Sequence, residues 1–314
     1  MFYKERELDV SIIIPTHNRA GILKESLEKL INQDYPKNLY EIIVVDDGSG
    51  DATKEIVENA AKNSPVSIKY LFQKNQGQGI ARNFGLRYTK GKIIIFGQDD
   101  ILVLSDFIKQ HVRFHTKYPQ ENVAVLGFIA WDPRLEITPF MDWLTNGSSV
   151  LGKFGGHQFA FEKLQNKQIA DYNFFYTSNI SLKASLIKKN PFDSRFSSYG
   201  WEDIELGYRL TKNFGLVIYY NPSAVGYHSH PMDESSLAAR MKQIGASAHL
   251  IQSKYPELNK VPSRFKKFIF FLISNPISLF LLKKIRELSN DKYSTLYFYA
   301  LSKKYFLEGL NSKI

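Results

Sequence analysis

Two adjacent aspartates, Asp99 and Asp100, follow a short apolar run at residues 92–96 that predicts a buried strand. Neighbouring carboxylates repel each other unless a positive charge lies between them. A divalent cation supplies that charge, and Mg²⁺ typically bridges one or two carboxylates to substrate phosphates. The pair is therefore a candidate metal site. The alternative is a solvated cap for the helix predicted over residues 104–118, because aspartate is common at helix starts.

Polar clusters also follow the other early apolar runs. They are Pro15-Thr16-His17-Asn18-Arg19, Asp46-Asp47-Gly48-Ser49, and Asn75 to Gly79 followed by Arg82. Each one alone is an ordinary turn sequence, since Asp-Gly-Ser and Asn-x-Gly form turns readily. If the runs are strands of one parallel sheet, however, the clusters meet at one edge, where ligands of such sheets bind. Their carboxylates and the arginine would then share one crevice.

A second acidic pair, Glu202 and Asp203, lies in the first turn of a helix predicted over residues 201–212. A helix N-terminus favours an ionised carboxylate, so an acid there is deprotonated and able to act as a general base at neutral pH. The alternative is that both acids only complement the helix dipole. Trp201, directly before them, either stacks on a sugar face or belongs to the core.

Two histidines, His228 and His230, stand two positions apart in the run AVGYHSHP. In an extended segment both point to the same face. Neutral imidazole is a good metal ligand, so this pair could supply one. The alternative is a pair of surface or hydrogen-bonded histidines.

The elements that must position these residues alternate between strands and helices. We expect strands at 10–15, 41–45, 66–72 and 92–96, and helices at 22–31, 51–63 and 80–88. Strands rich in Val and Ile that alternate with helices predict a mostly parallel sheet covered on both faces. Beyond residue 123 the pattern is less regular, with strands at 123–129 and 216–220 and helices at 201–212 and 235–254.

The composition narrows the class of protein. The chain has 314 residues, 44% of them hydrophobic and 23% charged, which is ordinary for a folded domain. It has no cysteine, which excludes disulfides, thiolate metal sites and cysteine nucleophiles. The N-terminal MFYKERELDV lacks the apolar core of a secretory signal, and we expect a cytoplasmic protein. The net charge is +10, but no zinc-finger spacing or RNA-binding signature is present, so we expect no nucleic-acid partner.

An apolar run at 268–282 is flanked by Lys266, Lys267, Lys283 and Lys284. As one helix it would be about 22 Å long, short of a hydrocarbon core of about 30 Å. Asn275 and Pro276 also interrupt its middle. We expect an in-plane or hairpin segment with its lysines toward an anionic membrane surface. The alternative is a pair of helices that packs on the catalytic domain or on a dimer partner.

Four of these segments, SIIIPTHNR, EIIVVDDGS, NQGQGIARNFGL and IIIFGQDD, occur in an order and spacing that resemble family 2 glycosyltransferases. The resemblance covers roughly residues 9–230. It implies an α/β fold of the GT-A type, with a mostly parallel central sheet flanked by helices. We expect a catalytic domain at 1–260, with a nucleotide-sugar half at about 1–120 and an acceptor half at about 121–260. After Pro262 the composition shifts to Phe, Leu, Ile and Lys, and we place there the start of a helical, membrane-associating tail at 261–314.

The resemblance also implies an activity, the inverting transfer of a sugar from a nucleotide-diphosphate sugar to an acceptor hydroxyl. The acceptor would be a glycan or a lipid-linked glycan, in polysaccharide, glycolipid or cell-surface glycan synthesis. The nucleotide-sugar site would be formed by Pro15, Thr16, Asn18, Arg19, Asp46, Asp47, Gly77, Arg82 and Asp99. Within it, Asp47 would bond the base and Arg82 would face the diphosphate.

The same resemblance assigns the metal and the base. Asp99 and Asp100 match the family's DXD motif, although Gly97 stands where its first carboxylate usually is. We expect Mg²⁺ or Mn²⁺ on Asp100, with Asp99 on the ribose or near the metal, and His228 as a further ligand. The segment SSYGWEDIELGYRL resembles the family's Glu-Asp motif. It implies Asp203 as the catalytic base, with Glu202 beside it and Trp201 at the acceptor.

Two other functions share parts of this pattern. A sugar-nucleotide nucleotidyltransferase would have a similar sheet and aspartates, but its first loop is glycine-rich with a basic residue, and PTHNRAG has its only glycine at the end. A non-catalytic nucleotide-sugar-binding protein would need no base, and the pair Glu202 and Asp203 argues against it.

Overall fold

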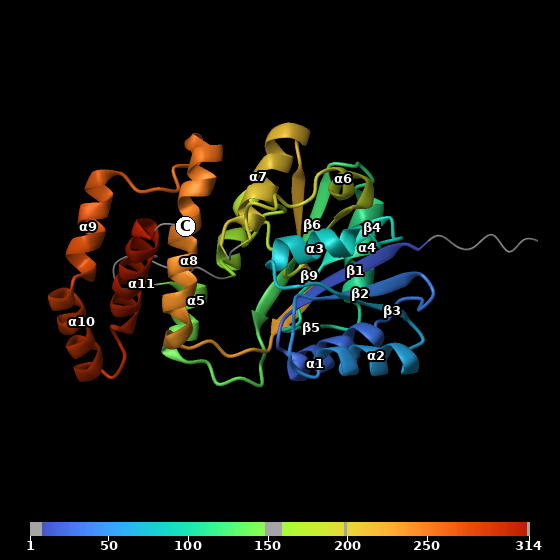
Figure 1. Cartoon of the computed structure of the whole chain (residues 1–314), viewed down its shortest axis with the longest axis horizontal. Helices are drawn as coiled ribbons and strands as arrows, with labels where there is room; N and C mark the ends of the chain where they lie inside the picture. Colours follow the sequence, from blue (N-terminus) through green and yellow to red (C-terminus); the bar gives the residue numbers. More distant parts are fainter. Residues whose placement is uncertain (1–7, 148–158, 198–199, 313–314) are drawn as a thin grey trace, which may run out of the picture. The chain divides into compact units, whose positions relative to one another are not determined.

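The computed structural model describes residues 8–147, 159–197 and 200–312, which form two compact units (Figure 1). The first unit comprises Met1–Arg134, Leu164–Ser197 and Glu202–His230, and the second comprises Leu135–Lys163, Ser198–Trp201 and Pro231–Ile314. Residues 1–7, where a secretory signal was not expected, lie outside the described residues, as do Ser198 and Tyr199 of the Glu-Asp segment. The domain boundary near residue 260 remains a sequence-based prediction.

A nine-stranded mixed sheet forms the centre of the first unit, counted over the described ranges. Its strand order is β3-β2-β1-β4-β8-β6-β9-β5, and β7 pairs with β9 off this path. Strands β3, β2, β1 and β4 are parallel, and β8 joins β4 and β6 antiparallel. The strands are β1 Val10–Thr16, β2 Tyr40–Asp46, β3 Ser67–Phe72, β4 Ile93–Phe96, β5 Ile101–Val103, β6 Val123–Trp131, β7 Ile169–Ala170, β8 Ile180–Lys183 and β9 Val217–His228.

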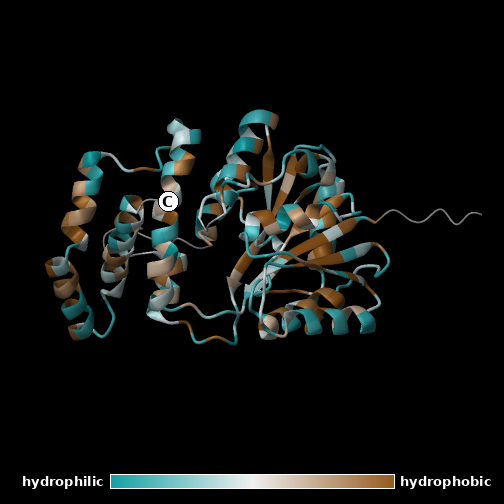
Figure 2. Cartoon of the chain, in the orientation of Figure 1, coloured by the Kyte–Doolittle hydropathy of each residue, from teal (hydrophilic) through white to brown (hydrophobic). Residues whose placement is uncertain are grey.

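Helices cover both faces of the parallel strands, with α1 and α2 on one side and α3 on the other (Figure 1). β1 and β2 are buried along their whole length, as expected for strands covered on both faces. Figure 2 shows that the strands are mostly hydrophobic and that the helices have one hydrophobic and one hydrophilic side. The helices of this unit are α1 Ala20–Ile31, α2 Thr53–Asn63, α3 Gln78–Leu86, α4 Phe107–Lys117, α6 Ala184–Lys189, α7 Glu202–Phe214 and the 3-10 turn Tyr172–Phe174. The predicted α/β class, with a central sheet flanked by helices, is confirmed; the sheet is parallel in its first half and mixed in its second.

The second half of the sheet contains strands that the sequence did not predict. β5 has three residues and β8 has four, too few for a periodic pattern to register. β9 is much longer than predicted, running on to His228. It pairs antiparallel with β5, with Ile101 opposite His228.

Helices make up the second unit. α5, α8 and α11 enclose an apolar core that includes Trp143, Met241 and Phe298, all 3% exposed or less. α8 and α11 approach so closely that a Cβ on Gly245 would lie 2.3 Å from the backbone oxygen of Phe306. The helices are α5 Pro139–Asn146, α8 Glu234–Lys254, α9 Arg264–Ser274, α10 Pro276–Leu288 and α11 Ser294–Asn311.

The predicted break in the C-terminal apolar run is confirmed. α9 ends before Asn275, whose side chain accepts hydrogen bonds from the backbone of Ile277 and Ser278 and so caps α10. Pro276 occupies the first position of α10, where its missing N–H costs nothing. Within the described residues no single helix has the length and apolarity to cross a membrane; α9 and α10 together do, but they are bent by 51°.

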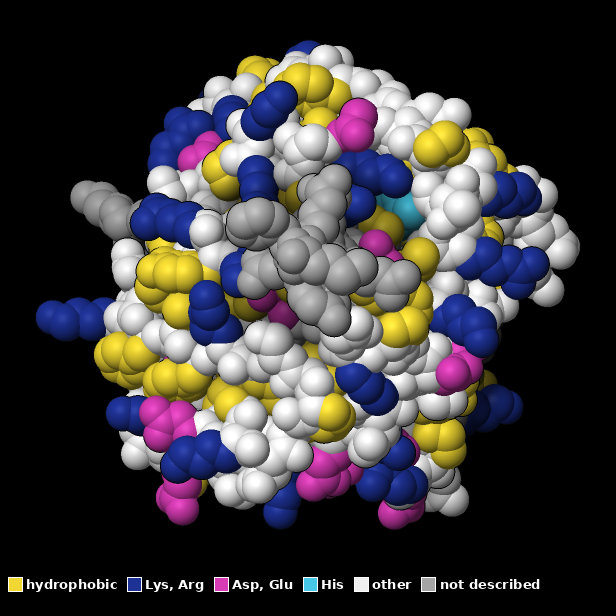
Figure 3. All heavy atoms as spheres, turned by 90° about the vertical axis from the view of Figure 1, so that its right-hand side faces the viewer, with side chains coloured by type: hydrophobic (Ala, Val, Ile, Leu, Met, Phe, Trp, Pro, Cys, Tyr) yellow, Lys and Arg dark blue, Asp and Glu magenta, His cyan; other side chains and the backbone are white. Residues whose placement is uncertain are grey.

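The positive side chains are dispersed on the face drawn in Figure 3. There Lys and Arg alternate with Asp, Glu and apolar side chains instead of forming one continuous band. Binding along a nucleic-acid backbone relies on such a band.

Candidate active site

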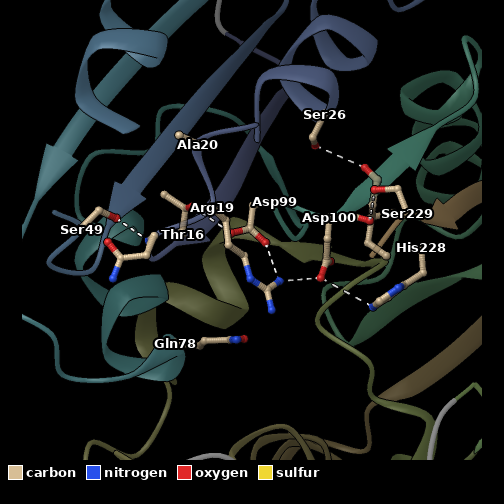
Figure 4. Close-up of polar contacts among 12 residues, drawn as sticks. Thr16, Arg19, Ala20, Ser26, Ser49, Gln78, Asp99, Asp100, His228 and Ser229 are labelled. Carbon is tan, nitrogen blue, oxygen red and sulfur yellow. Dashed lines mark hydrogen bonds and ion pairs between the residues drawn. The ribbon is translucent and has the colours of Figure 1, made fainter. Parts of the chain in front are cut away.

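Asp99 and Asp100 lie just beyond the carboxyl end of β4, beside the loop that follows β1 (Figure 4). Thr16 Oγ1 donates to Asp99 Oδ2 at 2.8 Å. A single guanidinium nitrogen, Arg19 Nη1, lies 3.2 Å from Asp99 Oδ1 and 2.6 Å from Asp100 Oδ2. The parallel pairing of β1 with β4 thus brings together the first loop and the aspartate pair, as the sequence predicted.

The strand pairing of the sheet also brings His228 close to the aspartate pair Asp99 and Asp100. Because Ile101 on β5 faces His228 on β9, the imidazole lies next to Asp100, with Nε2 3.6 Å from Asp100 Oδ2. Ser229 fixes the same residue by donating its backbone N–H, at 2.9 Å, and its hydroxyl, at 3.2 Å, to the Asp100 backbone oxygen. The Trp131 ring meets the imidazole edge to face, with centroids 5.0 Å apart.

The side chains of Asp99, Asp100 and His228 are of the types that bind a divalent cation. Asp100 Oδ1 is buried and has no hydrogen-bond partner among the described residues. Carboxylate oxygens with an imidazole nitrogen are suitable ligands for Mg²⁺ or Mn²⁺. Burial, and next the charge of Asp100, raise the pKa of Asp99 to about 6, while Arg19 and Thr16 oppose the rise. Over the described ranges no three acidic or histidine side chains stand together as a preformed metal centre. Any cation there would therefore take further ligands from the substrate or from water.

Asp46 and Asp47 hold the neighbouring loops. Asp46 accepts hydrogen bonds from the Ser49 backbone at 2.7 Å and from the Tyr70 hydroxyl at 2.7 Å. Asp47 accepts from the Gln73 side chain at 2.7 Å, the Gln76 backbone at 2.9 Å and the Gly77 backbone at 2.8 Å. A carboxylate has about four acceptor sites, so Asp47 retains room for one more donor, such as a nucleobase N–H.

Asn18 and Gly77 shape the two loops that flank Asp47. Asn18 has a φ of 52°, and its side-chain oxygen accepts from the Gly50 backbone at 2.8 Å, which ties the first loop to the second. Gly77 has a φ of 93°, and a Cβ there would lie 2.1 Å from the Ser197 backbone oxygen. Only glycine satisfies both conditions at the start of α3. Pro15, also assigned to this site, is a buried residue of β1.

Arg82 on α3 is fully buried, at 0% exposure. Its Nη2 donates to Gln78 Oε1 at 3.2 Å, and its guanidinium lies 5.8 Å from the centroid of the Phe192 ring. Nε and Nη1 have no acceptor among the residues that the structure describes. Burial lowers the pKa of the Arg82 guanidinium, and the charges of Asp203, Glu202 and Asp99 oppose that shift. A buried, charged guanidinium with two nitrogens that lack acceptors is poised for an anion.

Asp203 lies in the first turn of α7, where the sequence predicted it. Thr177 holds its carboxylate, through the backbone N–H at 3.1 Å and through the hydroxyl at 2.9 and 2.8 Å from the two oxygens. Burial raises the pKa of Asp203, opposed first by the charge of Arg82 and then by the donors of Thr177. A carboxylate with a raised pKa is a stronger base, provided that it stays ionised.

Trp201 has different surroundings, within the second unit. Its ring N–H donates to the Ile244 backbone oxygen at 2.9 Å, and Lys260 Nζ lies 5.1 Å from its ring centroid. A role at the acceptor remains a prediction for this residue.

Asp46, Asp47, Asn18 and Gly77 hold the neighbouring loops, and the predicted residues around the two acidic sites form two clusters and a connecting side chain. Thr16, Arg19, Asp99, Asp100 and His228 form the first cluster, and Asp203 with Thr177 the second. Arg82 interacts electrostatically with acids of both. No sequence pattern pointed to Thr177 or Ser229, because each acts through tertiary hydrogen bonds; Gln78 lies in the polar cluster Asn75 to Gly79, but its contact with Arg82 was not predicted. The contact of Phe192 with Arg82 was not predicted either.

The fold is thus an α/β sheet whose parallel strands end in acidic loops beside a buried arginine, at the edge where sheets of this kind bind ligands. Comparison with known proteins narrows this class. The sequence model described as "Glycosyl transferase family 2" matches residues 11–182, more than half of the chain. The chain belongs to this family. The match ends at residue 182 and therefore does not include Glu202, Asp203 or His228.

Among curated proteins, the chain is similar to validoxylamine A glucosyltransferase of Streptomyces hygroscopicus subsp. jinggangensis (strain 5008), with 29% identity over 64% of this chain and 51% of that protein. It is also similar to chondroitin synthase of Escherichia coli, with 29% identity over 79% of this chain and 38% of that one. The chain thus spans about half or less of these relatives' own length.

Solved structures share the GT-A fold. The mannosyltransferase PcManGT from Pyrobaculum calidifontis, in complex with GDP-Man and Mn²⁺, has a TM-score of 0.66 and 18% identity, covering 97% of this chain and 87% of that one. S. aureus TarS 1–349, in complex with UDP-GlcNAc, has a TM-score of 0.56 and 17% identity, covering 98% and 93%. At these identities the likeness establishes the fold.

Proposed function

We propose that this chain is a metal-dependent glycosyltransferase that moves a sugar from a nucleotide-diphosphate sugar to an acceptor hydroxyl, with inversion at the anomeric carbon. The observation that carries the proposal is the buried Arg82, whose Nε and Nη1 lack acceptors while Asp99, Glu202 and Asp203 lie near enough to act on its charge. A diphosphate suits a guanidinium in this position, because it accepts several charge-assisted hydrogen bonds at once.

The leaving diphosphate gains negative charge as the bond to the anomeric carbon breaks. Arg82 stabilises that charge from its buried position, where electrostatic interactions are stronger than in water. A bound Mg²⁺ or Mn²⁺, held by Asp100 and His228 with Asp99 close by, would supply Lewis-acid stabilisation to the diphosphate oxygens. Asp46, Asp47, Asn18 and Gly77 keep the flanking loops in place for the nucleoside.

Asp203 is the proposed base. It takes the proton of the acceptor hydroxyl while the acceptor oxygen bonds to the anomeric carbon and the electron pair of the broken bond leaves with the diphosphate. Thr177 holds the carboxylate in one orientation through its backbone N–H and through its hydroxyl, whose single proton is shared between the two carboxylate oxygens. General-base catalysis of this kind contributes roughly 10²- to 10⁴-fold to the rate.

Proteins of similar fold and sequence support the choice of substrates. One similar structure holds GDP-Man with Mn²⁺ and another holds UDP-GlcNAc, which supports a nucleotide-sugar donor and a divalent cation. A similar chondroitin synthase supports an acceptor that is a growing glycan. We therefore propose a glycan or lipid-linked glycan acceptor in polysaccharide or cell-surface glycan synthesis.

Hydrolysis and transfer assays test this function. The full chain is incubated with a panel of UDP-, GDP- and dTDP-sugars, with and without excess chelator. We expect slow release of free nucleoside diphosphate from one donor, loss of release on chelation, and recovery with Mn²⁺ or Mg²⁺. Pyrophosphate formation would instead indicate a nucleotidyltransferase, and donor binding without any turnover a non-catalytic binder. Full activity in excess chelator would overturn the metal dependence.

We further propose that α9 and α10 bind the anionic cytoplasmic face of a membrane, which makes the protein a peripheral one. α10 buries no residue, and α9 buries only Phe270 and Ser274. Large apolar side chains on both helices are therefore exposed: Phe265, Phe268, Phe271, Leu272, Ile277, Phe280, Leu281, Ile285 and Leu288 are all at least 45% exposed. Lysines at 266, 267, 283 and 284 flank this surface, which suits anionic headgroups.

A further inference from the structure

We propose that Arg19 is the built-in counter-cation of Asp99 and Asp100, and that a divalent cation entering this corner displaces its guanidinium. The inference rests on the metal dependence of the proposed function. The loop after β1 would then neutralise the two carboxylates, through Arg19, as long as no metal is bound.

The geometry places one nitrogen where a shared cation would lie. Arg19 Nη1 alone contacts both carboxylates, at 3.2 Å from Asp99 Oδ1 and 2.6 Å from Asp100 Oδ2 (Figure 4). His228 Nε2 is 3.6 Å from that same Asp100 oxygen. Two of the three candidate metal ligands, Asp99 and Asp100, therefore contact the guanidinium directly, and the third, His228, lies beside the same Asp100 oxygen.

Two buried carboxylates need such a partner. The side chains of Asp99 and Asp100 are only 7% and 6% exposed. Adjacent negative charges with little water around them repel each other strongly, so an empty corner would be costly. Arg19 supplies the only positive charge that contacts both acids among the described residues.

A metal ion and Arg19 cannot share the corner. Mg²⁺ binds oxygen at about 2.0–2.1 Å and repels a neighbouring guanidinium. A cation that bridges Asp99 Oδ1 and Asp100 Oδ2 would occupy the place of Nη1. Asp100 Oδ1, which has no partner, remains available as a second contact for the cation.

Arg19 is able to leave. Its side chain is 38% exposed, far more than either aspartate, and the two aspartates are its only acidic partners within the described part of the chain. Its backbone stays in place, because Leu23 N–H donates to the Arg19 oxygen at the start of α1. The released guanidinium would remain at the nucleotide site, where it can meet the anionic donor.

Metal titration without nucleotide tests the competition. Free Mn²⁺ is followed by electron paramagnetic resonance in the wild type, Arg19→Gln, Arg19→Lys and the control Lys109→Gln, which removes a charge paired with Asp34 elsewhere. An internal competitor lowers apparent affinity by the fraction of time that the site is open, so we expect Arg19→Gln to bind Mn²⁺ at least about tenfold more tightly. Arg19→Lys keeps the charge and should stay near the wild type, as should Lys109→Gln. In excess chelator, Arg19→Gln should melt at a lower temperature and recover with Mn²⁺.

A measurement on the wild-type chain keeps the inference testable if Arg19→Gln does not fold. The side-chain ¹⁵N–H signal of Arg19, assigned by its loss in Arg19→Lys, should shift when Mg²⁺ is added. An unmoved signal in protein that binds Mg²⁺, or unchanged Mn²⁺ affinity in Arg19→Gln, would overturn the counter-cation role and leave the proposed function intact. If the wild type and every variant bind no metal even with nucleoside diphosphate present, the metal dependence fails, and this inference with it.

Discussion

The burial of the Arg82 guanidinium is hard to explain by a contribution to the stability of the fold. A buried guanidinium loses its hydration, and each polar group left without a partner costs about 1–3 kcal/mol. Two of its nitrogens are in that position. Such groups persist at functional sites, because a ligand supplies the missing acceptors when it binds.

We predict that Arg82→Gln weakens binding of the nucleoside diphosphate, measured by calorimetry at saturating metal, by roughly tenfold to a hundredfold. This is the loss expected when charged hydrogen bonds of about 1.5–3 kcal/mol are removed. Arg87→Gln is a matched control, because Arg87 follows the same helix but is exposed. Equal affinities in both variants and the wild type would contradict a role for Arg82 at the diphosphate.

Asp203 and Glu202 are neighbours on α7, and we predict that only Asp203 is the base. Adjacent helical residues point roughly 100° apart, so only one of them aims readily at the acceptor hydroxyl. Asp203→Asn keeps the side-chain volume and should lower acceptor-dependent turnover by roughly 10² or more with little change in donor affinity. Glu202→Gln should act more on acceptor binding. A fast Asp203→Asn with an inactive Glu202→Gln would reverse the assignment, and two active variants would place the base elsewhere.

At the scale of elements, the backbones of α8 and α11 lie so close together that they limit which side chains fit at their contact. A Cβ on Gly245 would lie 2.3 Å from the Phe306 oxygen, and one on Gly309 would lie 2.1 Å from the Lys242 oxygen. The two helices therefore touch backbone to backbone at small residues. This contact makes the C-terminal helix part of the core of the second unit.

We predict that Gly245→Ala lowers the free energy of unfolding, measured with urea, by about 1–3 kcal/mol, the usual cost of overpacking. Gly21→Ala is the matched control, because Gly21 lies in helix α1 and a Cβ added there would meet no atom within 4 Å. In open space the same change should leave stability unaltered or raise it by up to about 1 kcal/mol. If both variants lose stability equally, the close approach is not the cause.

At the scale of the whole molecule, α9 and α10 carry large apolar side chains that are exposed among the described residues, and the same two helices contain lysines at 266, 267, 283 and 284. α11 packs against α8, so cutting the chain near residue 262 would expose the core of the second unit. Point substitutions in the full chain are therefore the cleaner test of membrane binding.

We predict that the wild-type protein floats with anionic phospholipid vesicles at low salt and that the double variant Phe271→Ser, Phe280→Ser does not. These rings are 57% and 60% exposed, so their loss should not disturb the fold. Phe72→Ser is the matched control, since Phe72 is 55% exposed on β3 and should not matter for binding. A wild type that stays unbound would point to a protein interface instead, and sedimentation would then report a dimer.

The sequence by itself determined the strands of the parallel half of the sheet and the order of the polar loops that follow them. It also provided Asp99, Asp100 and Asp203 as the candidate acidic residues of the site. Strongly apolar runs that alternate with helical patterns leave few arrangements, and their carboxyl ends must meet. β1, β2 and α7 accordingly lie within two residues of the predicted limits. The break between α9 and α10 at Asn275 and Pro276 was also predictable from the sequence, because proline disrupts the interior of a helix.

Only the tertiary structure decided what each side chain contacts. His228 reaches Asp100 because β5, a strand of three residues, pairs with β9, and a segment that short carries no pattern. Thr177 reaches Asp203, and Arg19 bridges two aspartates 80 and 81 positions away, through single contacts across the fold. Local sequence encodes which elements form, because propensity and periodicity act over a few residues; partners this distant depend on register and packing, which only the assembled sheet specifies.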